Sequence, residues 1–150
     1  MSKFKAKIIN RPSKALRDLK KIGVNMSGPD LVRVGLPKGS NAYPDGTSVI
    51  MVGTVHEFGS PSRGIPQRSY LRSTLVENRA KYKKVLATLA GKMVDGKLDK
   101  KEALSLLGLR VQTDVREQIT DLKTPSLVSR EGNPLIDTGH LRQSIAFEVT

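Results

Sequence analysis

Two long stretches of helical periodicity in the middle of the chain limit the folds that it can adopt. Tyr70–Val94 and Asp99–Ile119 both repeat apolar residues every three or four positions. Asp95-Gly96 separates them, and Asp99 followed by Glu102 predicts a capping box at the second start. We therefore expect an antiparallel helical hairpin that supplies much of the core. Its apolar positions are Leu71, Leu75, Tyr82, Val85, Leu86, Leu89 and Met93, then Leu104, Leu107, Val111, Val115 and Ile119.

Shorter segments predict a small antiparallel sheet beside this hairpin. Lys3–Ile9 and Ile145–Val149 alternate apolar and polar residues, and Leu31–Leu36 is rich in β-branched residues. Glu148 of the last segment is expected to face a lysine of the first strand. The sequence thus predicts an α+β fold, in which N-terminal, central and C-terminal strands pack against the hairpin and long loops are exposed. Residues 1–150 are expected to form a single domain.

The segment Thr47–Phe58 is apolar almost throughout and fits either a buried strand or a buried helix. Ser48 follows an Asp-Gly turn and would cap a helix, which favours the helical alternative without deciding it. After Gly59 the chain enters a loop, Ser60–Gln67, in which two prolines limit its freedom. Pro37–Gly46 and Asp121–Asn133 are also expected to be loops.

Basic residues are concentrated in two segments, residues 1–23 and 61–84. The chain has a formal net charge of +12, and residues 1–23 contain eight Lys or Arg residues against one Asp. Ser13 predicts the start of a short helix that ends at Gly23, with Leu16, Leu19 and Ile22 at near-helical spacing. The opposite face is a candidate surface for DNA or an acidic partner, although it fits a solvated face equally well. It carries Lys14, Arg17, Lys20 and Lys21.

Neither a metal site nor a catalytic site is expected. The chain has no cysteine, and His56-Glu57 lacks the second histidine, one helical turn later, that a metalloprotease motif needs. Ser144 and His140 lie near Asp137, but no nucleophile turn or oxyanion donor set accompanies them. No apolar run is long enough for a bilayer, so we expect a soluble protein without a cofactor or membrane contact.

Glu57, near the end of the apolar segment Thr47–Phe58, is expected to have a structural role. We expect Glu57 to be partly buried and paired with Arg68 or Arg72, which would hold the following loop in place. Asp137 is expected at the N-cap of a helix that precedes the last strand. Glu57, Arg68, Arg72 and Asp137 are therefore predicted to form a structural clasp.

Two motifs, in this order, resemble those of the tail-completion or neck proteins that join heads to tails in tailed bacteriophages. The first is HEFG at 56–59, followed by a short loop, IPQRSYLR at 65–72 and a long helix. The second is PLIDTGHLRQSI at 134–145. The first motif departs from the family at Gln67, Ser69 and Tyr70, where a small residue, a proline and a phenylalanine are expected. The resemblance extends from Leu31 to Thr150.

The resemblance implies a non-enzymatic structural protein of the virion, a minor tail component. Such a protein would form a ring, expected to be a hexamer, that contacts the phage connector or adaptor and the tail proteins. DNA would pass through its lumen without sequence-specific binding, and the ring would be made and assembled in the host cytoplasm.

Two alternatives come from the residues. The first is a free basic nucleic-acid-binding protein limited to backbone contacts, since aromatic residues make up only 4% of the chain and tryptophan is absent. The second is a hydrolase that depends on His56 or Ser144.

Overall fold

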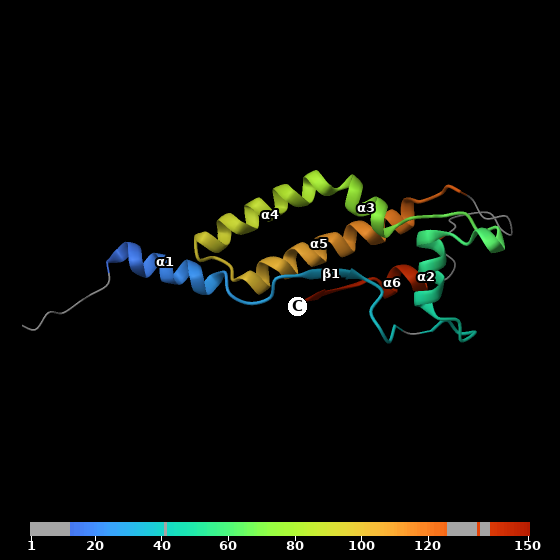
Figure 1. Cartoon of the computed structure of the whole chain (residues 1–150), viewed down its shortest axis with the longest axis horizontal. Helices are drawn as coiled ribbons and strands as arrows, with labels where there is room; N and C mark the ends of the chain where they lie inside the picture. The colour runs from blue at the N-terminus through green and yellow to red at the C-terminus, as the bar shows by residue number, and fades with distance from the viewer. Residues whose placement is uncertain (1–12, 41, 126–134, 136–138) are drawn as a thin grey trace, which may run out of the picture.

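A computed structural model describes residues 13–40, 42–125, 135 and 139–150, which adopt an α+β fold (Figure 1). The predicted fold class is therefore confirmed, with a sheet of two strands in the described residues. The N-terminal strand predicted at Lys3–Ile9 and its pairing with Glu148 lie outside them. In chain order, the elements are α1 Lys14–Asn25, β1 Val32–Gly35, α2 Val49–Phe58, the 3-10 helix η1 Pro61–Arg63, α3 Leu71–Glu77, α4 Arg79–Val94, α5 Lys100–Asp121, α6 His140–Ser144 and β2 Ala146–Val149.

The strands β1 and β2 come from distant parts of the chain and pair antiparallel. Val32 lies opposite Val149 and Val34 opposite Phe147, so these partly buried side chains share the face that packs on α5. Arg33 lies opposite Glu148 on the other face, an arrangement of unlike charges that favours this register. The predicted central and C-terminal strands are thus present.

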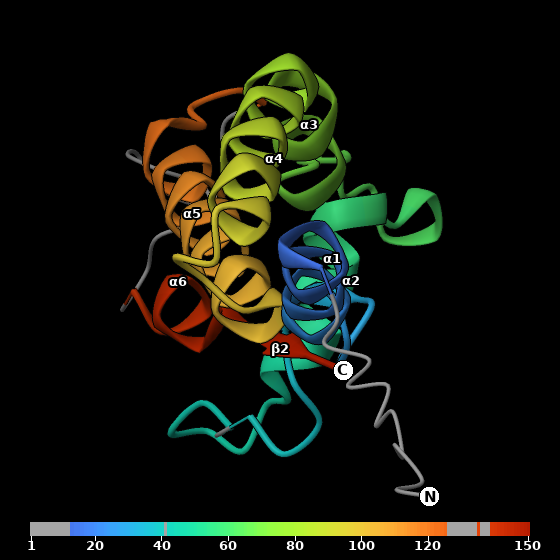
Figure 2. The same cartoon turned by 90° about the vertical axis from the view of Figure 1, so that its left-hand side faces the viewer.

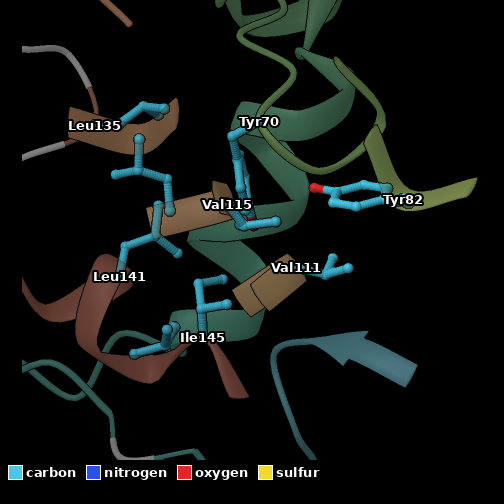
Figure 3. Close-up of a cluster of buried hydrophobic side chains, with 9 residues drawn as sticks. Tyr70, Tyr82, Val111, Val115, Leu135, Leu141 and Ile145 are labelled. Carbon is cyan, nitrogen blue, oxygen red and sulfur yellow. The ribbon is translucent and has the colours of Figure 1, made fainter. Parts of the chain in front are cut away.

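The helices α4 and α5 form the predicted antiparallel hairpin, and α5 lies between this hairpin partner and the sheet (Figures 1 and 2). The predicted capping box is confirmed, because Asp99 accepts from Glu102 N at 2.7 Å and Glu102 accepts from Asp99 N at 3.0 Å. Buried Asp114 of α5 binds Lys81 of α4 at 2.8 Å. The core cluster includes Val49, Tyr70, Tyr82, Val111, Val115, Ile119, Leu135, Leu141 and Ile145 (Figure 3).

The single helix predicted over Tyr70–Val94 is wrong, because the chain breaks at Asn78 into α3 and α4. The side-chain amide of Asn78 donates to Thr74 O at 3.0 Å, and asparagine favours such local bonds over a continuous helix. Leu75 and Leu86, expected in the core, are 50% and 43% exposed. The two helices therefore do not share one apolar stripe.

The helix α2 settles the alternatives at 47–58 in favour of a helix, and Ser48 caps it by accepting from Met51 N at 3.4 Å. Ser13 caps α1 as predicted, accepting from Leu16 N at 3.2 Å. Gly23 does not end α1. It is not among the glycines with a positive φ, and the helix continues to Asn25. The helix contacts α4 and otherwise projects from the body (Figures 1 and 2).

Candidate functional site

The candidate site begins where α2 ends and the chain reverses at Gly59. This residue has a φ of 74°, and a Cβ there would lie 2.9 Å from Gln67 N and 3.1 Å from Ile65 O. Only glycine fits such a left-handed position so close to another backbone segment. Ser60 and Ile65 then exchange backbone hydrogen bonds of 2.8 and 3.0 Å, which close the loop. The loop therefore returns the chain to the end of α2, next to Glu57.

The Glu57 carboxylate, 3% exposed, binds the first turn of α3. One oxygen accepts from Tyr70 N and Leu71 N, both at 2.9 Å. The other accepts from Ser69 Oγ at 2.7 Å, Arg72 N at 3.2 Å and Arg72 Nε at 3.0 Å. The first amides of a helix have no partner within it, so Glu57 caps α3 from outside. We call Glu57 with residues 69–72 the Glu57 clasp.

Two opposing effects set the pKa of Glu57. Burial alone raises it, because a carboxylate loses hydration energy inside the protein. The hydrogen bonds from Leu71 N, Ser69 Oγ, Arg72 and Tyr70 N outweigh burial, so the pKa lies below its ordinary value. The clasp is therefore built for the ionised carboxylate.

The predicted pairing of Glu57 with an arginine is confirmed for Arg72. Its guanidinium also donates to Glu57 O at 3.2 Å and lies 4.8 Å from the centre of the Phe58 ring. Arg68 has a different position: its backbone N donates to His56 O at 2.7 Å, and its Nε donates to Pro125 O at 2.7 Å. Arg68 thus ties the loop to the segment after α5.

The prediction that Asp137 is an N-cap is wrong. Asp137 lies outside the described residues, and the N-cap of α6 is Gly139. With a φ of 75°, Gly139 occupies a left-handed conformation that glycine adopts without strain.

Residues of the two sequence motifs pack against each other. A Cβ at Gly53 of α2 would overlap Leu36, the Tyr70 hydroxyl and Leu141, so α2 and these side chains approach as closely as glycine allows. Tyr70 of the first motif and Leu141 and Ile145 of the second share the buried cluster (Figure 3). The clasp therefore lies directly on the core.

Ser144 and His140, the pair considered for catalysis, make other contacts. Ser144 Oγ donates to the backbone oxygen of His140 at 2.9 Å rather than to its imidazole. The His140 ring instead contacts that of Tyr43, with centroids 4.9 Å apart. His56 Nδ1 is buried and has no partner among the described residues, and burial followed by the charge of Arg68 lowers the pKa of this imidazole. Among the residues described, no three His, Asp or Glu side chains gather as metal ligands.

The second candidate surface lies on α1. Lys14, Arg17, Lys20 and Lys21 are all exposed, as predicted for a contact surface or a solvated one. Among the described residues, none of the four takes part in an ion pair. The surface is therefore cationic and accessible.

Sequence reasoning missed the backbone part of the clasp and the contact between Arg68 and Pro125. One signal was available: Tyr70 precedes α3 and makes no side-chain capping bond, so the helix needs a cap from elsewhere.

Comparisons with known protein families, curated proteins and solved structures find no match. Within the described ranges, no helix has both the length and the apolar composition to cross a bilayer.

Proposed function

We propose that the chain is a non-enzymatic structural protein of a tailed-phage virion, which forms an oligomeric ring at the head-to-tail interface. One observation supports the proposal most. The motifs that carry the resemblance meet in one structural unit, where Glu57 caps α3 and Tyr70 packs in the same buried cluster as Leu141 and Ile145. Their described residues hold elements together, as expected of an assembly module.

The proposed ring uses a rigid body with projecting segments. The α4–α5 hairpin and the core would form the body, while α1 and the loops at 37–46 and 60–67 would reach neighbouring proteins. Head-to-tail contacts between identical subunits close into a ring when their rotation allows it, and we expect about six subunits. One side would face the connector or adaptor and the other the tail, with DNA passing through the lumen.

Electron microscopy of purified virions that carry a labelled copy of this chain tests the proposal. We expect the label at the neck or at the head-proximal end of the tail. Phage that lack the chain should yield DNA-filled heads and separate tails. Joined, infectious particles formed without the chain would contradict the proposal.

A free nucleic-acid-binding protein is the second candidate, because the four cations of α1 are exposed and lie outside the described ion pairs. Contacts limited to phosphates would weaken steeply with salt. Duplex DNA binding by the isolated subunit at physiological salt, measured by fluorescence anisotropy, would favour this candidate. We expect no such binding.

A further inference from the structure

The helix α1 carries an apolar stripe that the body does not cover. Leu16 and Leu19 of the helix and Met26 at its C-cap lie along one side at positions i, i+3 and i+10, and their side chains are 46%, 64% and 48% exposed. We call these three residues the α1 stripe. Among the described side chains of α1, only Ile22 is partly buried, and the helix contacts α4. Leu16 and Leu19 have the near-helical spacing noted in the sequence, and the structure leaves both side chains in solvent.

The stripe lies on a helix that carries four cations and one acidic residue, Asp18. Lys20 lies beside the stripe, and Lys14, Arg17 and Lys21 lie behind it on the helical projection. A surface of this kind attracts an acidic partner without placing charge between the two apolar faces. Lysine and arginine stems can also lie along apolar surface while their charged ends reach outward.

We propose that α1 docks, with its stripe inward, in an apolar groove with an acidic rim on a different virion protein. The inference rests on the function proposed above and names the chemistry of the partner. Docking of an amphipathic helix in a groove is a common recognition mode, in which residues at i, i+3 and later turns serve as anchors. Charge complementarity selects the partner.

A second copy of the chain fits this stripe poorly. Two α1 helices that packed stripe to stripe would bring their lysines and arginines close together, so repulsion opposes this arrangement. The helix α4, which contacts α1, adds five Lys or Arg residues and no acidic residue. DNA would engage the cations of α1 but would gain nothing from burial of leucine and methionine. A protein groove with an acidic rim would contact both the apolar stripe and the cations of α1.

Single cysteines provide the test, because the natural chain has none. Leu19→Cys places a thiol in the stripe, and the matched control Lys21→Cys places one on the opposite face. The rate of maleimide modification is measured for each full-length variant, free and in purified virions. We expect Cys modification at position 19 to slow by about tenfold or more in virions, since reaction requires an accessible thiolate. Modification at position 21 should slow much less.

Each contrary outcome has its own meaning. If the chain is present in virions and Cys at position 19 reacts as fast there as in the free subunit, the docking inference alone is overturned. Chain absent from virions overturns the proposed function and the inference with it. Stronger protection at position 21 than at 19 indicates contact through the basic face, as DNA would make. Protection of position 19 in the free subunit indicates cover by this chain or a second copy, depending on its concentration dependence. Equal protection by anionic lipid vesicles alone indicates a membrane surface. These last three outcomes also overturn the docking inference.

Discussion

The Glu57 carboxylate accepts five hydrogen bonds from residues 69–72, and four of them come from Tyr70, Leu71 and Arg72. Its partner Arg72 is 55% exposed, whereas the carboxylate is almost fully buried. The solvent around Arg72 weakens their mutual attraction, so the backbone amides matter more than the ion pair. The clasp is mainly a helix cap.

Glu57→Gln tests this assignment. Glutamine offers one acceptor oxygen and turns an NH₂ group toward amide donors, so we expect a loss of about 2–3 kcal/mol in the free energy of unfolding. The control Arg72→Gln removes only the half-exposed partner and should cost less than about 1 kcal/mol. Urea unfolding followed by circular dichroism measures both. Equal losses would show that the ion pair dominates.

The stability difference between wild type and Glu57→Gln should also depend on pH. The folded pKa of Glu57 is depressed, so its contribution is complete above the unfolded value of about 4.3 and is lost as pH falls through the folded pKa. We expect a constant difference at pH 6–8 and a smaller one at pH 3, by urea titration. A difference that persists unchanged at acid pH would contradict the assignment.

Gly59 makes a second prediction at this scale. Gly59→Ala combines a left-handed backbone with overlap against residues 65 and 67, and should lower the unfolding free energy by about 2–3 kcal/mol. The control Gly64→Ala has a φ of 64° but open space around its Cβ, so only the backbone cost of about 1 kcal/mol applies. Thermal denaturation would compare them. A larger loss at Gly64 would exclude steric contact as the cause.

At the scale of elements, α5 holds the others because it contacts the sheet, the helices α3 and α4, and α6. Close approach to β2 depends on Gly108, where a Cβ would overlap the Phe147 ring. The helix therefore contains a poor helix former at a position where packing requires it.

Two glycine substitutions separate packing from helix propensity. Gly91→Ala in α4 meets no atom within 4 Å and should stabilise the protein by about 0.5–1 kcal/mol. Gly108→Ala gains the same helix propensity but displaces the Phe147 ring. Overpacking costs about 1–3 kcal/mol, so we expect the free energy of unfolding to fall by about 1 kcal/mol. Chemical denaturation measures both changes. Stabilisation by both variants would mean that β2 moves freely.

Local sequence signals predicted many of these elements, whereas the sequence did not show which side chains other elements would bury. Ser13, Ser48 and the Asp99–Glu102 box act on neighbouring amides, so the sequence located the starts of α1 and α5 and favoured a helix start at Ser48 without deciding it. Periodicity showed that Leu16 and Leu19 share a face, but it could not show whether anything covers that face. In the clasp, the acidic and basic partners were predictable, but the Tyr70 and Leu71 amides depended on where the loop returns.

At the scale of the whole molecule, exposed cations lie both on α1 and on α4, which contacts it. Under the proposed function, reversal of all four α1 cations, Lys14, Arg17, Lys20 and Lys21, should prevent head-to-tail joining, because it would repel the acidic partner proposed for α1. Reversal of Arg79, Lys83, Lys84 and Lys92, four exposed cations of α4, changes the net charge equally.

Electron microscopy of particles made with each variant supplies the measurement, with circular dichroism to verify folding. We expect separate heads and tails only for the α1 variant. Normal virions from that variant would remove α1 from the joining surface. If neither variant joins heads to tails, the loss of total charge, and not of the α1 surface, would be the cause.

The pairing of β1 with β2 has a consequence for synthesis. Residues 32–35 leave the ribosome early, but their partners at 146–149 emerge only after all the helices between them. Contacts so distant along the chain form late, after the long connection has been ordered. The sheet therefore cannot form on a nascent chain until residues 146–149 have left the ribosome.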